Sequence, residues 1–187
     1  MSNPLIRLLE LSVSGFSEMD TFRSLWSSEA DRTLRVLKAL PSDQYDFRPD
    51  PKGRSIGELA WHLAEIDACL SFGVAKGQFN YDDHVPDLKR PREINELAPG
   101  YRRVHEQAVA RLNNIDDEIL DNQVTFSDGR PMTIRDVLWD ELLHHLIHHR
   151  GQLTLMCRMS SGAPPGLYGP NREEMNELMA RMQPAKA

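Results

Sequence analysis

The chain has 187 residues, of which 40% are hydrophobic and 27% are charged, and its net charge is −6. These values are ordinary for a globular protein, and the length predicts a single domain, residues 1–187, with its own hydrophobic core. Nucleic-acid binding needs basic side chains that neutralise phosphates. Because no Lys/Arg block is longer than a pair such as Arg102-Arg103, the composition argues against a nucleic-acid partner.

The sequence also argues against a secreted or membrane protein. The chain reaches the charged residue Glu10 before any long apolar run develops, so we expect no signal peptide. No uncharged apolar stretch approaches the roughly 18 to 20 residues that a membrane span needs. The two cysteines, Cys69 and Cys157, lie far apart and form no CxxC motif. These observations predict a cytoplasmic protein without a membrane partner.

Two long helices are predicted in the first half of the chain. Residues 17–40 have helical apolar periodicity, and the prolines of residues 47–53 make the following segment a loop. Ser55 and Glu58 form a capping-box pattern that begins a second helix, which continues to about Ala75. A polar loop follows over residues 78–92.

Two more long helices are predicted in the second half. The third covers residues 93–120, where Pro99-Gly100 is expected to interrupt it and leaves open one helix or two pieces. A tight turn, and with it a small hairpin, is expected at residues 124–132. The last long helix begins at the Thr133 cap and ends near Met159. Residues 160–187 are expected to form a loop and a short C-terminal helix, and the whole pattern is typical of an all-α four-helix bundle.

Four of the seven histidines lie in the last predicted helix, as two overlapping pairs with i, i+4 spacing. This spacing places two imidazoles on one face of a helix, where a single metal ion can bridge them. At about 100° per residue, His145 and His149 fall within the apolar arc of the helix, whereas His144 and His148 lie roughly 90° to 130° from its centre. His145 and His149 are therefore expected to face the core.

A catalytic metal site usually has three protein ligands, so a third residue is needed. His84 lies in the polar loop and His105 lies in a charged stretch of the third helix, so both are expected at the surface. His62 lies at the edge of the apolar face of the second helix, from which a side chain can reach a facing helix. The sequence therefore predicts a metal site formed by His62, His145 and His149.

Two rival interpretations apply to the same histidines. A dinuclear bundle needs a second Glu-x-x-His motif besides Glu141-x-x-His144, and the chain has none. A hydrogen-bonded polar core without a metal is the other rival, since a single histidine on an apolar face is usually such a residue. Elemental analysis of protein purified without a His-tag distinguishes that rival from a metal site.

Other reactive residues receive mainly structural interpretations. Glu65 and Gln152 are candidates for hydrogen bonds to the metal ligands, although a purely structural role is the simpler expectation for each. Arg150 is expected to pair with a carboxylate rather than to orient an anionic substrate. Cys69 has no paired base and is expected to be a small core residue. The tryptophans are expected to be packing groups: Trp26, Trp61 and Trp139. The catalytic residues stay unknown at this point.

With these residues in place, the chain resembles the DinB/YfiT-like family of metal-dependent proteins over nearly its whole length. The resemblance rests on Arg48-Pro49, on residues 55–59 with His62-Leu63, on His145-x-x-x-His149-Arg-Gly-Gln152, and on the tail at residues 164–170. It implies an up-down-down-up four-helix bundle, often dimeric, in which three histidines hold one divalent ion in an open pocket. Nickel or zinc is the leading expectation for that ion, with iron or manganese as alternatives.

The resemblance also implies an activity class. Characterised members include transferases and isomerases that use a low-molecular-weight thiol, such as bacillithiol, mycothiol or glutathione. The leading hypothesis is therefore a metal-dependent enzyme that activates a thiol or water for a small-molecule substrate, and most specifically a thiol S-transferase. Metal-activated hydrolysis is the nearest variant. The alternative is a non-enzymatic metal-binding or stress-response protein, which would explain why no acid/base pair is evident.

Overall fold

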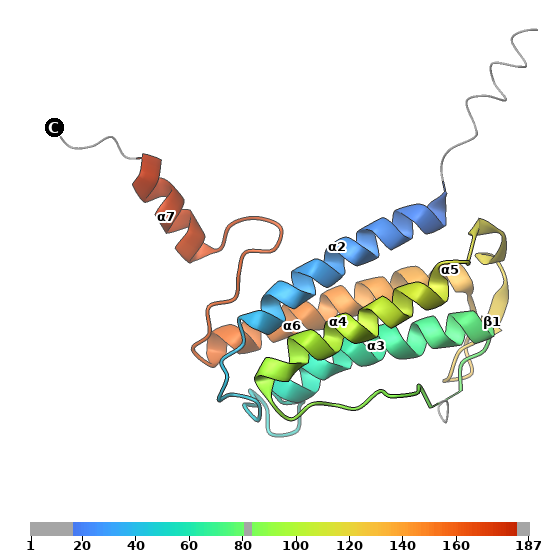
Figure 1. The fold of residues 1–187 in the computed structure, drawn as a ribbon, viewed down its shortest axis with the longest axis horizontal. Coiled ribbons are helices and arrows are strands. Elements are labelled where there is room, and N and C mark those ends of the chain that lie inside the picture. Colours follow the sequence, from blue (N-terminus) through green and yellow to red (C-terminus); the bar gives the residue numbers. More distant parts are fainter. Residues whose placement is uncertain (1–16, 81–83, 183–187) are drawn as a thin grey trace, which may run out of the picture.

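The computed structural model describes residues 17–80 and 84–182. Four long helical segments form a bundle in it (Figure 1), and a small two-stranded sheet is added at one end. The segments are α2 (Glu18–Lys38), α3 (Ile56–Lys76), α4 (Ile94–Leu112) and a composite last helix of α5 (Ile134–Asp136), η2 (Val137–His144) and α6 (His145–Met159). The predicted all-α four-helix bundle is confirmed. None of the helices in the described ranges has the length and apolar content needed to cross a bilayer.

The helices follow the expected up-down-down-up order. α2 and the last helix run in one direction, and α3 and α4 run parallel to each other in the opposite direction (Figure 1). Because a tight turn cannot join two parallel helices, the link between α3 and α4, described at residues 77–80 and 84–93, returns along the length of the bundle (Figure 1). α3 packs most extensively against α4 and also packs against α6. Helix α3 therefore contacts both α4 and α6, which carry the other residues of the two histidine sites described below.

The predicted helix starts agree with the structure. Ser55 Oγ accepts a hydrogen bond from the Glu58 backbone N–H at 3.2 Å, and the Ser55 N–H donates to Glu58 Oε2 at 2.9 Å. The last helix begins with the same capping box, formed by Thr133 and Asp136. At the other end of α3, Gly77 has a φ of 68°, a left-handed conformation that glycine adopts without steric cost.

The third helix ends earlier than predicted, at Leu112 rather than near residue 120. The acidic segment after α4, residues 116–118, contacts the start of helix α2 instead. Asp117 accepts hydrogen bonds from the backbone N–H groups of Glu18 and Met19, at 3.0 and 2.8 Å, so it caps the start of α2. A short 3₁₀ turn, η1 (Asp117–Ile119), holds it there.

Pro99 lies inside α4 without dividing it, so the expected interruption is absent and α4 is one helix. The proline removes a backbone hydrogen bond, and packing of the helix compensates for that loss. Gly100 permits this packing, because a Cβ there would lie 2.9 Å from the ring of Trp61. Trp61 and Trp26 are fully buried, as expected of packing groups, and Trp139 packs half-buried against the core.

The last helix contains a π-helical segment, η2, that the sequence pattern did not predict. The backbone N–H of His145 donates to the carbonyl of Asp140, five residues earlier. A π-helical turn holds one more residue in each hydrogen-bonded ring than an α-helical turn, and such segments are frequent at functional sites. Here the segment ends where His145 begins α6.

The hairpin and the C-terminal extension were both predicted. β1 (Gln123–Thr125) pairs antiparallel with β2 (Pro131–Thr133), with Val124 opposite Met132. The turn between the strands lies beside the last turns of α3. Beyond α6, a loop leads to α7 (Arg172–Met182), which lies outside the bundle (Figure 1).

Arg150 pairs with a carboxylate, as predicted, and it does so in the core. Its side chain is 1% exposed and its guanidinium faces the carboxylate of Glu29. Arg150 also donates to the Glu29 carbonyl at 2.8 Å, and the hydroxyl of Tyr168 donates to Glu29 Oε2 at 2.7 Å. This network ties α2, α6 and the C-terminal loop together.

Candidate metal centre

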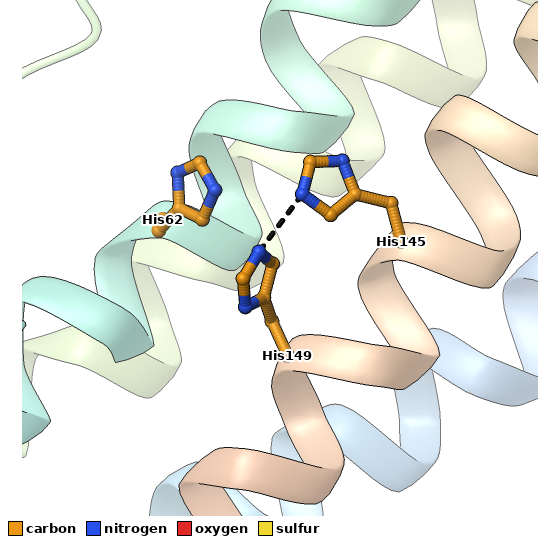
Figure 2. A group of neighbouring side chains, drawn as sticks. All are labelled: His62, His145 and His149. Atoms are coloured by element: carbon orange, nitrogen blue, oxygen red, sulfur yellow. Dashed lines mark hydrogen bonds between the residues drawn. The ribbon is translucent and has the colours of Figure 1, made fainter.

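Three histidines converge at the face where α3 meets α6, and we call them the three-histidine cluster: His62, His145 and His149. Their rings face one another in Figure 2. One ring nitrogen of each lies within 4.8 Å of the others. Ring centroids are 4.9 Å apart for His62 and His149 and 4.6 Å apart for His145 and His149. The convergence expected from helical phase is therefore present.

The Nδ1 nitrogen of each ring faces an oxygen acceptor. The pairs are His62 with Glu65 Oε2 at 3.2 Å, His145 with the Glu141 carbonyl at 3.2 Å, and His149 with Gln152 Oε1 at 2.7 Å. An acceptor in this place holds the proton of a neutral imidazole on Nδ1 and leaves a lone pair on Nε2. All three rings thus present Nε2 lone pairs to the centre of the cluster.

The Nε2 atoms of His145 and His149 are 2.8 Å apart, as the dashed line in Figure 2 marks. Two nitrogen lone pairs at this distance repel each other unless a cation, either a proton or a metal ion, lies between them. Imidazole nitrogens are good ligands for zinc, nickel, copper and iron. The donor set and its orientation therefore fit a divalent metal ion.

Protonation does not compete strongly with a metal at these rings. Burial, reinforced by the nearby imidazoles of His145 and His62, lowers the pKa of His149 from 6.5 to about 4, although the hydrogen bond to Gln152 opposes the shift. Burial, followed by the charge of His62, also lowers the pKa of His145. Both rings are consequently neutral near pH 7, which is the form that binds a metal.

One side of the cluster opens into a cavity of about 550 Å³, which we call the metal-side cavity. Its wall combines α3, the link before α4, the hairpin turn, the π-helical segment and the first residue of α6. Residues from these elements include His62, His145, Glu65, Glu141, Leu88 and Phe126. A small molecule in this cavity therefore lies next to two residues of the cluster, His62 and His145.

The other histidines of the last helix lie outside the cluster, as predicted. The His144 side chain is 64% exposed and its Nδ1 lies 2.9 Å from Asp140 Oδ1. His148 is exposed, and its Nε2 accepts a hydrogen bond from Gln152 Nε2 at 3.0 Å. Glu141 does not pair with His144; it accepts from Arg130 at 3.2 Å. No dinuclear ligand set is found within residues 17–80 and 84–182.

His105 is not a surface residue, which corrects the prediction. Its side chain is 13% exposed, and its Nδ1 lies 2.8 Å from Oδ2 of the fully buried Asp67. The ring of Trp26 packs edge-on against it, with centroids 4.7 Å apart. The charged neighbours of His105 in sequence point elsewhere on α4, because only one face of that helix packs against α3.

Cys69 is also placed differently from the prediction. It is exposed and lines the metal-side cavity rather than the core. Desolvation, followed by the negative charge of Glu65, raises the pKa of its thiol. The side chain is therefore an uncharged part of the cavity wall at neutral pH.

The sequence interpretation missed one contributor to the cluster, the backbone carbonyl of Glu141 that orients His145. No side-chain pattern reports a carbonyl. Glu65 and Gln152 were candidates for hydrogen bonds to the ligands, and the structure has both of them in that position. Their spacing of three residues from His62 and His149 was the signal.

Comparison with known proteins finds relatives that match most of this chain. The chain is 27% identical over 160 residues to the uncharacterised protein YrdA of Bacillus subtilis (strain 168), covering 85% of this chain and 93% of YrdA. A DinB-like protein from Bacillus cereus ATCC 10987 has a similar crystal structure, with a TM-score of 0.67 and 26% identity, over 81% of this chain and 98% of that one.

A more distant structural neighbour has the same architecture. YfiT from Bacillus subtilis, described as a probable metal-dependent hydrolase with an unusual four-helix bundle topology, has a TM-score of 0.61 and 14% identity. The match covers 80% of this chain and 93% of YfiT. The family model of the DinB superfamily matches residues 25–153, a range that contains the whole three-histidine cluster. The chain therefore belongs to the DinB superfamily.

Proposed function

We propose that this chain is a divalent-metal-dependent enzyme with His62, His145 and His149 as its metal ligands, and most specifically a thiol S-transferase. One observation carries the proposal: three Nε2 lone pairs converge without a carboxylate among them, beside an open cavity. Three neutral imidazoles leave the charge of a divalent ion uncompensated and leave at least one coordination position free. When bound, the ion would lower the pKa of a thiol or a water molecule at that position. The family resemblance makes nickel and zinc the leading expectation for this ion, with iron and manganese as alternatives.

The surroundings of the cluster favour a thiol over water. The two carboxylates at the cavity next to the cluster are both engaged, Glu65 by His62 and Glu141 by Arg130. A water nucleophile benefits from a free general base, whereas a coordinating thiol is deprotonated by the metal without one. In the transfer, the thiol proton passes to solvent, the sulfur bonds to an electrophilic carbon, and the leaving group departs with the bonding electron pair.

The metal-side cavity has the size that such a reaction needs. Its volume of about 550 Å³ lies within the usual range for small-molecule sites, roughly 300 to 1,000 Å³. A low-molecular-weight thiol cosubstrate and a small electrophile are therefore the proposed ligands. Arg54 lines the same cavity and supplies a positive charge for an anionic group of either molecule.

Hydrolysis is a second candidate, and one observation favours it. The carboxylate of Glu141 lines the metal-side cavity one helical turn before His145, where release from Arg130 would make it a general base. YfiT, which shares the fold, is described as a probable metal-dependent hydrolase. Under this candidate, Glu141→Gln abolishes turnover and leaves metal binding intact.

Metal binding is tested first. Protein purified without a His-tag is analysed for its metal content and is then titrated with zinc and with nickel by calorimetry. We expect one ion per chain for the wild type, no binding at the same concentrations for His149→Ala, and wild-type binding for the control His144→Ala on the same helix. Equal binding by the two variants would refute the proposed ligand set.

Activity is tested next, with chlorodinitrobenzene as the electrophile and bacillithiol, mycothiol and glutathione as thiols. We expect metal-loaded wild type to consume at least one thiol above background and His149→Ala to consume none. Hydrolysis of a nitrophenyl ester without any thiol would favour the second candidate. Metal binding without either reaction would favour a non-enzymatic metal-binding or stress-response protein.

The homodimer expected from the family resemblance stays a prediction. Multi-angle light scattering of the purified protein, with and without metal, tests it directly. The expected result is a mass of about twice the 21.4 kDa of the chain.

A further inference from the structure

A second cavity adjoins the metal-side cavity, and we call it the aromatic recess. Its volume is about 190 Å³, and three phenylalanines contribute to its wall: Phe72, Phe79 and Phe126. The two cavities share four lining residues, which are Cys69, Leu70, Phe126 and Ser127. These shared residues place the two cavities next to each other, and we call the pair the cleft, with the three-histidine cluster at one end and the aromatic recess at the other.

The aromatic recess is built by a reversal of the chain after α3. Gly77 ends the helix in a left-handed conformation, and Phe79 then folds back onto the last turns of α3. Gly73 makes room for it, since a Cβ at that position would lie 2.1 Å from the Phe79 ring. On the other side, the Phe126 ring of the hairpin turn lies with its centroid 5.3 Å from that of Phe79. Three separate elements thus enclose the recess.

The two ends of the cleft differ in chemistry. The metal-side cavity carries charged or ionisable groups on Arg54, Glu65 and Glu141 in addition to the histidines. The recess, as far as the described residues line it, has Asn80 and Ser127 as its polar side chains besides the thiol of Cys69, and none of its lining residues is charged. A ligand that fills the whole cleft can therefore place a charged or metal-ligating group at one end, and it meets no charged lining side chain among the described residues at the other.

We propose that the aromatic recess is the subsite for the apolar tail of a substrate whose polar head reaches the three-histidine cluster. The inference rests on the proposed function, because it takes the cluster as the place where the head binds. The ligand class is a small molecule with a metal-ligating head and an aryl or short alkyl tail. Under thiol transfer, the tail belongs to the electrophile and the recess selects apolar electrophiles over small polar ones.

Cys69 lies where the two cavities meet and is compatible with this assignment. Its raised pKa keeps the thiol uncharged at neutral pH. An apolar tail can pass a neutral thiol without losing hydration of an anion. The residue is exposed, so it also reports on occupancy of the cleft.

The test uses zinc-loaded protein and two hydroxamates with the same metal-binding head. Acetohydroxamate has a methyl tail, and 3-phenylpropanohydroxamate has an aryl tail that can extend into the recess. Each buried methylene strengthens binding about fourfold. We therefore expect the aryl compound to bind the wild type tighter by about tenfold or more, as measured by titration calorimetry.

A variant and a matched control distinguish binding of the aryl tail in the recess from nonspecific apolar binding elsewhere on the protein. Asn80 is exposed and lines the recess but not the metal-side cavity, so Asn80→Trp fills the recess without disturbing the core. Gln78 is exposed in the same link and lines neither cavity. We expect the advantage of the aryl compound to disappear in Asn80→Trp and to persist in Gln78→Trp, with acetohydroxamate affinity unchanged in both.

A second readout needs no variant. Alkylation of Cys69 by iodoacetamide should slow when the aryl hydroxamate fills the cleft, and should slow less with acetohydroxamate at equal occupancy. Cys157 is buried and serves as the internal reference.

Equal affinities of the two hydroxamates for the wild type would overturn the inference, as would an aryl advantage that survives in Asn80→Trp. If zinc binds but the tail has no effect, the subsite alone is wrong. If the preceding zinc titration shows no binding, the proposed function fails and the subsite falls with it.

Discussion

Helix α3 contributes to two histidine sites that face different neighbours and have opposite designs. On one side, His62 joins His145 and His149 at the edge of the metal-side cavity. Five residues later, Asp67 pairs with His105 in the interior of the bundle, and we call this pair the closed site. Both sites are partly or fully buried, and both contain hydrogen-bonded imidazoles.

The difference lies in what each site leaves unmatched. Asp67 accepts hydrogen bonds from Trp26 Nε1 at 2.9 Å and from His105 Nδ1 at 2.8 Å, so each donor faces a carboxylate oxygen. In the three-histidine cluster, the oxygen acceptors all lie at the Nδ1 atoms. The Nε2 lone pairs have no donor among the described residues and face one another. The closed site has both of its donors matched without a ligand, whereas the three-histidine cluster would be completed by a cation between its Nε2 atoms. We infer that the former contributes stability and the latter contributes function.

The largest expected effect is on the closed site. Asp67→Ala removes the acceptor of two buried donors, and each unsatisfied group costs about 1 to 3 kcal/mol, so we expect a loss of roughly 2 to 6 kcal/mol in the free energy of unfolding. Urea denaturation of the metal-free protein measures it. The matched control is Asp140→Ala, which removes an aspartate–histidine contact of 2.9 Å with a partner that is 64% exposed. That variant should lose less than about 0.5 kcal/mol, and equal losses would contradict the role of burial.

Zinc should distinguish the two sites in the reverse direction. At a free zinc concentration 100 times the dissociation constant, binding stabilises the folded wild type by about 2.7 kcal/mol. We expect His149→Ala to lose this increment. His105→Ala should be less stable than wild type but should keep the increment. Thermal unfolding of the three proteins, each with zinc and with a chelator, measures these increments, and a zinc increment that is lost in His105→Ala would contradict the distinction between the two sites.

Gln152 tests how far the cluster depends on its hydrogen-bond partners. It accepts from His149 Nδ1 at 2.7 Å and so fixes the ring with Nε2 toward the cluster. Gln152→Ala should weaken zinc binding about 10- to 100-fold, which is the usual effect of losing such a partner. Gln152→Glu retains an acceptor oxygen and should restore most of the affinity. Competition with a chromophoric chelator measures both variants; an unchanged affinity in Gln152→Ala would mean that packing alone orients His149.

The Arg48–Glu58 pair at the start of α3 should contribute a small amount to the stability of the whole fold and should favour neither histidine site. Arg48 donates to the Glu58 carboxylate at 2.7 Å, and this hydrogen bond, with a second one from Ser55, lowers the Glu58 pKa from 4.5 to about 2. A folded-state pKa below the unfolded one gives stability that is present above pH 4.5 and is lost as the pH falls toward 2. Because the pair is partly exposed, we expect about 1 kcal/mol at neutral pH.

Glu58→Gln tests this expectation, since glutamine can keep the capping box but does not titrate in this range. The variant should be less stable than wild type at pH 7, and the difference should shrink between pH 4.5 and pH 2 in urea titrations. Its zinc affinity at pH 7 should equal that of the wild type. A difference that does not change with pH would show that the carboxylate contributes only its shape.

Much of the cluster could be predicted from the sequence because helical phase is a strong constraint. The i, i+4 spacing of His145 and His149 and the edge position of His62 were enough to select these three among seven histidines. The phase was not perfect, because the fully buried positions of this turn are Leu146 and Arg150, and the two histidines lie half-buried beside them. A wheel of 100° per residue takes no account of the wider turns of η2 just before His145.

The closed site could not be predicted, for a different reason. Sequence neighbours of His105 are charged and suggest a surface position, but burial depends on which face of α4 meets α3. That choice is made by tertiary packing, such as the approach of Trp61 to Gly100. The prediction for Cys69 was wrong for the same reason. Its apolar neighbours suggest a core position, whereas the hairpin and the link, which are placed by tertiary packing, form a cavity beside it.

The π-helical segment Val137–His144 makes the length of the last helix as important as its composition. Removing one residue from this segment would allow ordinary α-helical hydrogen bonding, but it would turn everything on one side of the deletion by about 100° relative to the other. Either the imidazoles of His145 and His149 would swing away from His62, or the apolar side chains before them would leave the core. Substitutions in these turns should therefore be tolerated far better than a single deletion.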